Sequence, residues 1–117
     1  MPKLYYASPR DLPLIEPSPG VKGRVVNADH ATVIVYDYAP KTVVETHKHE
    51  VEQIGVVVRG SLAMVIAGEQ RILMPGDSYR VPAKAAHGLR VFEEPTQVVA
   101  LFAPPRTDLP RRTRPQV

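Results

Sequence analysis

Two histidines, His47 and His49, stand one residue apart in front of a hydrophobic run, in a chain that has only four histidines. Side chains at positions i and i+2 of a β-strand lie on the same face, so we expect the two imidazoles to point together. Neutral imidazole binds Zn, Cu, Fe, Ni or Mn, but an isolated HxH pair is more often a surface or hydrogen-bonded pair than a metal site. A third histidine, His87, follows a predicted turn and strand and could approach the pair from across the fold. His30 has no such surroundings, and we assign it to a loop or to a satisfied position in the core.

The segments that must position these histidines are short and rich in Val, Ile, Leu and Tyr. Turn signals separate eight such runs, at residues 31–38, 43–49, 53–59, 61–68, 70–74, 78–83, 87–92 and 96–102. No run has a sustained helical period, and 13 prolines argue against long helices. Many short antiparallel strands in one small domain must close on themselves or stack as two sheets, because open edges pair with other chains. The sequence therefore predicts an all-β barrel or jelly roll.

The chain of 117 residues has the size of one small domain, and its 44% hydrophobic and 23% charged residues are typical of a globular protein. Residues 1–23 hold five prolines and predict an extended N-terminal arm, which leaves 24–105 for the barrel and 106–117 for a basic, flexible tail. The net charge of +3 lies in that tail, because residues 1–105 hold 11 basic and 11 acidic groups. A basic terminus of this kind is more often solvated than a binding arm, so we infer no nucleic-acid partner.

Cysteine is absent, so any metal site must use histidine, carboxylate or amide ligands. No segment approaches the ~18 consecutive apolar residues of a membrane helix. The first residues, MPKLYYASPRDLP, lack the apolar region of a secretory signal. We therefore expect a cytoplasmic protein without a membrane partner.

The segment KTVVETHKHEVEQIGVVVRG resembles the first sequence motif of the cupins, in which a glycine, an HxH pair, a glutamate and a second glycine follow at set intervals. In this chain His47, His49 and Gly60 are in register with that motif. Lys41 takes the place of the first glycine, and Gln53 takes the place of the glutamate.

The segment GDSYRVPAKAAHGLRV is similar to the second cupin motif, and 15 residues separate the two. Gly76, Pro82 and His87 match that motif, whereas Lys84 and Val91 stand at its second glycine and its asparagine. Two lysines thus occupy expected glycine positions, which means that those turns either need no positive φ or tolerate strain. The resemblance implies an RmlC-like double-stranded β-helix, a jelly-roll barrel.

The resemblance to cupins implies one divalent transition metal ion, Zn, Ni, Mn, Fe or Cu, held by His47, His49, His87 and Gln53. A neutral amide oxygen leaves the ion with its full charge, so we expect a stronger Lewis acid and a lower affinity than a glutamate would give. Glu52 is the rival to Gln53, but its strand parity is opposite and it would need a bulge to reach the site.

Within the cupins, the chain is most similar to the small pectin-degradation cupins that linearise unsaturated uronates. Its last strand and turn, VVALFAPPR, match theirs at Phe102, Pro104, Pro105 and Arg106, but Ala100 stands where they have an aspartate. By this resemblance, Arg106 would hold a substrate carboxylate and Phe102 would line the pocket, although a surface arginine and a core phenylalanine are equally compatible with the sequence. The resemblance also implies a homodimer, in which the arm could be exchanged between subunits.

The alanine at position 100 leaves the proton-transfer group of the predicted enzyme unassigned, because a methyl group neither accepts nor donates a proton. Tyr36 and Tyr38 lie on one face of a predicted strand and are candidates for this role, and core packing would explain them equally well. The leading hypothesis is a metal-dependent cupin enzyme that acts on a carboxylated or hydroxylated small molecule, uronate- or keto-acid-like, by Lewis-acid catalysis of an isomerase or lyase type. The alternatives are a non-catalytic module that binds metal or sugar acids, a cupin dioxygenase, and a structural cupin without metal.

Overall fold

The computed structural model describes residues 5–109, which form ten strands and one turn of 3-10 helix, η1 (Pro9–Asp11). The strands are β1 (Leu14–Ile15), β2 (Val21–Asn27), β3 (Thr32–Tyr38), β4 (Val43–His47), β5 (Glu52–Arg59), β6 (Leu62–Ile66), β7 (Glu69–Leu73), β8 (Ser78–Val81), β9 (His87–Val91) and β10 (Thr96–Ala103). All eight strands predicted from the sequence are present, so the all-β prediction is confirmed. No helix among residues 5–109 has the length and hydrophobicity needed to span a membrane.

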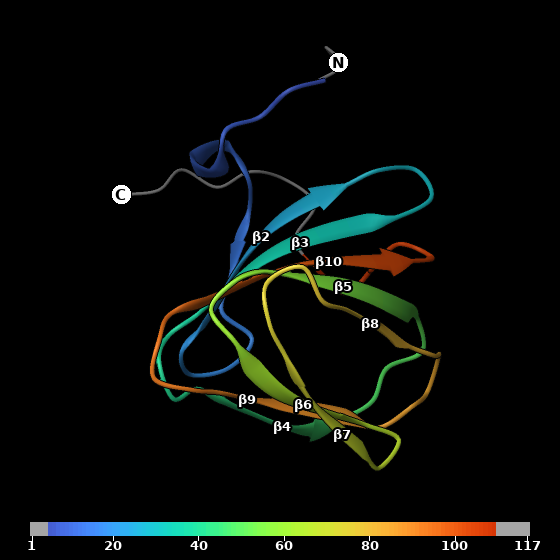
Figure 1. The fold of residues 1–117 in the computed structure, drawn as a ribbon. Coiled ribbons are helices and arrows are strands. Elements are labelled where there is room, and N and C mark those ends of the chain that lie inside the picture. The colour runs from blue at the N-terminus through green and yellow to red at the C-terminus, as the bar shows by residue number, and fades with distance from the viewer. Residues whose placement is uncertain (1–4, 110–117) are drawn as a thin grey trace.

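Two antiparallel sheets form the barrel. One has the strand order β1-β2-β3-β10-β5-β8 and the other has the order β4-β9-β6-β7. Figure 1 shows β4, β9, β6 and β7 along one side of the barrel and the larger sheet along the other. From β3 to β6 and again from β7 to β10, each strand lies in the other sheet from the one before it, so the chain crosses the interior repeatedly as in a jelly roll.

The larger sheet extends into the residues predicted as an arm. Leu14 of β1 pairs with Arg24 of β2, and Val21 at the start of β2 pairs with Tyr38 of β3. The predicted boundary between arm and barrel, after residue 23, therefore falls inside β2. Residues 1–4 and 110–117, which include most of the predicted basic tail, lie outside the described residues.

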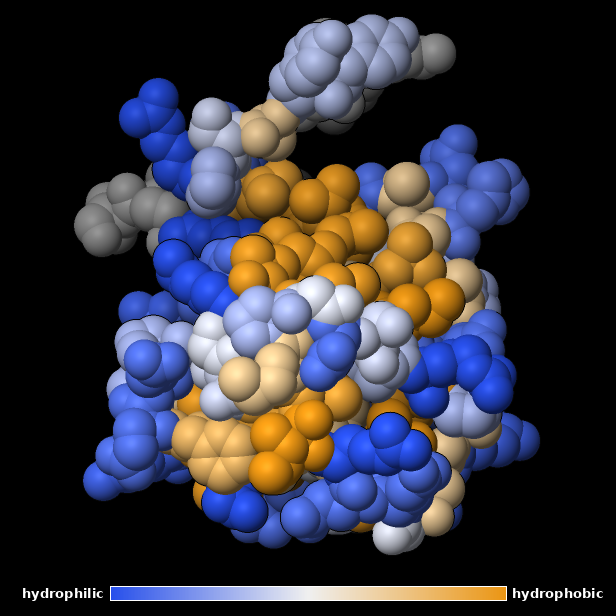
Figure 2. All heavy atoms as spheres, in the orientation of Figure 1, coloured by the Kyte–Doolittle hydropathy of each residue, from blue (hydrophilic) through white to orange (hydrophobic). Residues whose placement is uncertain are grey.

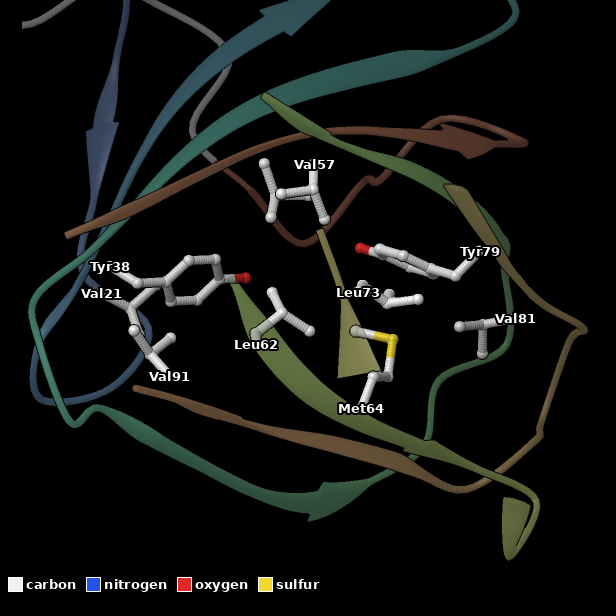
Figure 3. Close-up of a cluster of buried hydrophobic side chains, with 10 residues drawn as sticks. Val21, Tyr38, Val57, Leu62, Met64, Leu73, Tyr79, Val81 and Val91 are labelled. Carbon is white, nitrogen blue, oxygen red and sulfur yellow. The ribbon is translucent and has the colours of Figure 1, made fainter. Parts of the chain in front are cut away.

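The interior of the barrel is filled by alternate residues of the strands. Along β5, Gln53, Gly55 and Val57 are buried, whereas the residues between them are exposed. The main hydrophobic cluster, shown in Figure 3, consists of Val21, Tyr38, Val57, Leu62, Met64, Leu73, Tyr79, Val81, Val91 and Val98. A second cluster consists of Val25, Ile34, Ala100 and Phe102. The only buried polar side chain on β5 is therefore Gln53, at the end of the strand nearest the histidines.

Two lysines adopt the left-handed conformation at the expected glycine positions. Lys41 has φ 64° and Lys84 has φ 67°, so the expectation that these turns need no positive φ is wrong and the alternative of tolerated strain holds. Each turn is fixed by a backbone hydrogen bond of 2.8 Å: Lys41 N donates to the carbonyl of Phe92, and Lys84 N donates to the carbonyl of His49. The second bond ties the turn before β9 to the loop that carries a predicted metal ligand.

Candidate metal centre

Three histidines meet at one end of the barrel interior. His47 ends β4 and His87 begins β9, and the two are directly paired across the smaller sheet, while His49 lies in the loop that follows β4. One ring nitrogen from each of the three lies within 4.8 Å of the others. The ring centroids of His47 and His87 are 4.3 Å apart, and those of His49 and His87 are 4.8 Å apart. The fourth histidine, His30, is exposed in the turn between β2 and β3, so of its two expected places the loop is the one observed.

The backbone fixes which nitrogen each histidine presents to the others. Every Nδ1 lies 2.9–3.0 Å from a carbonyl oxygen two residues away, those of Glu45, Val51 and Ala85 for His47, His49 and His87 respectively. A carbonyl oxygen only accepts, so each Nδ1 carries a hydrogen, and Nε2 is the nitrogen that each ring would offer to a metal ion. Burial lowers the pKa of His87, and its two histidine neighbours lower it further against the effect of the Ala85 carbonyl. Burial thus favours the neutral form of His87, the form of imidazole that binds a metal ion.

Gln53 brings an oxygen to the same place. Its side chain is 7% exposed, and its Oε1 lies 3.1 Å from Nε2 of His49. An amide oxygen and an unprotonated imidazole nitrogen are both acceptors and repel each other unless a cation or a proton lies between them. The donor set of three Nε2 atoms and one amide oxygen therefore fits a divalent transition metal ion. The rival residue Glu52 is on the outer face of β5, 3.7 Å from Arg80 of β8, and does not point to this site.

The amide nitrogen of Gln53 has a partner that sequence reasoning missed. Gln53 Nε2 donates to the hydroxyl oxygen of Tyr79, on β8, at 2.8 Å. Tyr79 is 8% exposed, and burial raises the pKa of its hydroxyl far above the usual value, so the group is neutral at all physiological pH values. Tyr79 lies in the second motif, but its contact with a residue 26 positions earlier depends on the pairing of β5 with β8.

An arginine lies next to the histidines. The ring of Phe102, 1% exposed on β10, meets that of His49 edge to face with centroids 5.7 Å apart. The guanidinium of Arg106 lies 4.9 Å from the centre of the Phe102 ring, and the backbone N of Arg106 donates to the hydroxyl of Thr32. Arg106 is thus held beside the site, with only 17% of its side chain exposed.

The guanidinium of Arg106 is paired with Asp108, a residue that the sequence analysis did not single out. Nε and Nη2 of Arg106 donate to the two carboxylate oxygens of Asp108 at 2.9 and 2.7 Å. This pairing raises the pKa of Arg106 and holds the pKa of Asp108 below its usual range. The sequence does carry a signal for this pair. An arginine and an aspartate two positions apart, directly after a Pro-Pro turn, are close enough to form a bidentate pair.

A cavity of about 970 Å³ connects these groups, and its lining includes His47, His49, His87, Gln53, Tyr36, Tyr38, Phe102, Arg106 and Asp108. The rings of Tyr36 and Tyr38 stack with centroids 5.7 Å apart. Burial raises the pKa of Tyr36 to about 12 and that of Tyr38 well above its usual value, so neither acts as a base at neutral pH. Ala100 is fully buried in the second core cluster, between Ile34 of β3 and Gly55 of β5.

Residues 34–103 match the sequence profile of the cupin domain family. The chain is 32% identical over 100 residues to the pectin degradation protein KdgF of Dickeya dadantii (strain 3937), which covers 84% of this chain and 91% of that protein. KdgF from Halomonas sp. aligns with a TM-score of 0.75 and 31% identity, over 81% of this chain and 88% of that one. An RmlC-like cupin from Shewanella frigidimarina aligns with a TM-score of 0.82 at 20% identity, over 91% of this chain and 96% of that one, which shows the shared fold.

Proposed function

The chain belongs to the cupin domain family, as its two motifs predicted, and on this premise we propose that it is a metal-dependent enzyme acting on a carboxylated small molecule. The proposed substrate is uronate- or keto-acid-like, and the proposed reaction is of an isomerase or lyase type. The observation that carries the proposal is the meeting of His47, His49 and His87, whose ring nitrogens lie within 4.8 Å of one another, with the amide oxygen of Gln53 3.1 Å from Nε2 of His49. The identity to KdgF, over most of both chains, supports the substrate class.

The four ligands would hold one divalent transition metal ion and leave one or two coordination positions for substrate. When bound, such an ion supplies Lewis acidity to a carbonyl or enol oxygen. The Nδ1 hydrogen bonds to backbone carbonyls fix the three rings, so the site is preorganised by the fold. Imidazole and amide ligands suit Zn, Ni, Mn, Fe and Cu alike.

Arg106 and Phe102 would bind and orient the substrate. A guanidinium presents a planar fork to the two oxygens of a carboxylate, and here Phe102 lies between that fork and His49. A small acid bound by Arg106 at one end could therefore reach the histidines at the other. Tyr36 lies in the same cavity, and because its hydroxyl remains protonated it would serve as a hydrogen-bond donor to the substrate.

A non-catalytic cupin that binds metal and a sugar acid is the second candidate. The buried methyl group of Ala100 favours it, because the corresponding aspartate of the pectin-degradation cupins is the proton-transfer group implied by the resemblance. A dioxygenase reaction would use the same ligands and stays an alternative. A cytoplasmic location also stays a prediction.

Turnover separates the candidates. Protein loaded with metal would be incubated with unsaturated uronates and with keto acids, and the product followed by absorbance and NMR. The enzyme proposal expects turnover that is lost in His87→Ala and kept in His30→Ala, since His30 is exposed and belongs neither to the histidine cluster nor to the lining of the cavity. Binding of uronate without conversion of any substrate would favour the second candidate.

We also propose a homodimer that uses the outer face of the larger sheet. Figure 2 shows a hydrophobic area over β2 and β3, framed by hydrophilic side chains. The outer face exposes Val26, Ile54, Val56, Val58 and Leu101 by 38–48% each, where a solvated antiparallel sheet would carry polar residues. Strand spacings give this apolar patch a footprint of about 400 Å², so the surrounding polar rim would complete the ~800 Å² that each partner contributes to a standard interface.

A further inference from the structure

The two ends of the Gln53 amide differ in what they can do at the metal centre. The oxygen has lone pairs that can bind a cation, whereas the NH₂ group only donates hydrogen bonds. With its oxygen toward the histidines, the amide completes the donor set. With its nitrogen there, it would donate to the free Nε2 of His49 instead and block the site. Glutamate in this position would present an oxygen in either orientation.

Tyr79 contacts the other end of this amide. Its hydroxyl oxygen accepts the hydrogen bond from Gln53 Nε2 at 2.8 Å, and both side chains are buried. With this acceptor in place, the amide nitrogen is satisfied while the oxygen faces the histidines. Without it, the orientation that presents the oxygen to the histidines would bury an NH₂ group that has lost its acceptor.

The Tyr79 ring is held in place by the strand that carries Gln53. Gly55 is directly paired with Tyr79 and lies two residues after Gln53, on the same inward face of β5. A Cβ atom at Gly55 would overlap the Tyr79 ring at its hydroxyl end, so only glycine leaves the space that the ring occupies. Figure 3 shows the ring lying inside the barrel, with its hydroxyl pointing inward.

We propose that Tyr79 is a positioning residue that holds the Gln53 amide with its oxygen toward the three histidines and thereby sets the metal affinity of the site. The inference rests on the metal site of the proposed function. It makes Tyr79 and Gln53 a coupled pair, in which the tyrosine hydroxyl accepts from the amide nitrogen while the amide oxygen faces the histidines.

The test is the affinity of the whole chain for Zn²⁺, measured by competition with a chromogenic chelator. Tyr79→Phe removes the hydroxyl and keeps the ring, and we expect it to weaken Zn²⁺ binding by about 10- to 100-fold, as is typical when a partner of a metal ligand is lost. Ser78→Ala is the matched control, because it removes a neighbouring hydroxyl on the exposed face of β8. Thermal unfolding of the metal-free variants establishes that each one is folded.

A second set of variants, built on Gln53→Glu, distinguishes an effect on the amide orientation from an effect on the packing of the fold. Gln53→Glu offers an oxygen in either orientation, so adding Tyr79→Phe to it should weaken Zn²⁺ binding by less than about threefold. Equal losses in both backgrounds would mean that the hydroxyl supports the fold and not the amide orientation, which overturns the inference. An unchanged affinity of Tyr79→Phe would also overturn it. Wild-type protein that binds none of Zn²⁺, Ni²⁺, Mn²⁺, Fe²⁺ or Cu²⁺ would instead refute the proposed function and, with it, the premise of this inference.

Discussion

Asp108 is expected to compete with substrate for Arg106, and removing its charge should strengthen the binding of carboxylates. Asp108 occupies two of the donors of Arg106, Nε and Nη2, at 2.9 and 2.7 Å, and its negative charge would repel a carboxylate that binds to the same guanidinium. The Asp108 side chain is 63% exposed, which places the pair near the ~1 kcal/mol upper end for solvent-exposed ion pairs. Because ~1.4 kcal/mol corresponds to a factor of ten, Asp108→Asn should tighten the binding of a uronate by about 3- to 5-fold.

Calorimetric titration of the metal-loaded protein with D-galacturonate would measure this effect. Asp37→Asn is the matched control, because it removes the same charge from an exposed residue that pairs with Arg59 and Gln97 away from the cavity. Arg106→Ala should abolish the gain. Weaker binding by Asp108→Asn would refute the reasoning, since it would mean that Asp108 itself contacts the ligand or holds Arg106 in its binding position.

Three further predictions concern stability and assembly. The lowered pKa of Asp108 means that its pair with Arg106 stabilises the fold above the ordinary aspartate pKa of 3.8 and loses this effect as the pH falls through the lower folded value. The difference in Tm between wild type and Asp108→Asn should therefore shrink on acidification from pH 6 to below 3, and a constant difference would contradict the assignment. Lys84→Gly should raise the free energy of unfolding in urea by about 0.5–1 kcal/mol, since φ is 67° there and the ion pair lost with Glu50 is exposed; a decrease would show that this turn is unstrained. Val56→Glu should give a monomer mass in light scattering where wild type gives a dimer, and a monomeric wild type would contradict the proposed interface.

The sequence predicted the eight strands from β3 to β10, and it missed β1 and β2. In β2 the inward positions are Val21, Gly23 and Val25, and the central glycine hides the alternation. That glycine is required because a Cβ there would lie 2.8 Å from Ile34 and 3.0 Å from Ile15 of the neighbouring strands. Such a constraint arises from packing across the sheet, so a reading of β2 by itself could not reveal it.

The grouping of the three histidines and Gln53 was predictable from the motif spacing, although His49 lies in the loop after β4 and not on the strand that the parity argument assumed. Their partners were not, because those contacts join distant parts of the chain. Tyr79 contacts Gln53 because β5 pairs with β8. Arg106 lies beside the site because it packs on the ring of Phe102, which in turn contacts His49. The sequence likewise could not assign the Nδ1 hydrogen bonds, which depend on local backbone turns.

The central claim is that His47, His49, His87 and Gln53 form one metal site, and its most direct test is the metal content of protein purified without chelator. Elemental mass spectrometry would compare wild type with His49→Ala and Gln53→Ala, and with His30→Ala as the histidine control. The proposed site predicts close to one transition metal ion per chain in wild type and His30→Ala, and its loss in the other two variants. Wild-type protein that is empty, and stays empty after incubation with Zn²⁺, Ni²⁺, Mn²⁺, Fe²⁺ or Cu²⁺, would contradict it.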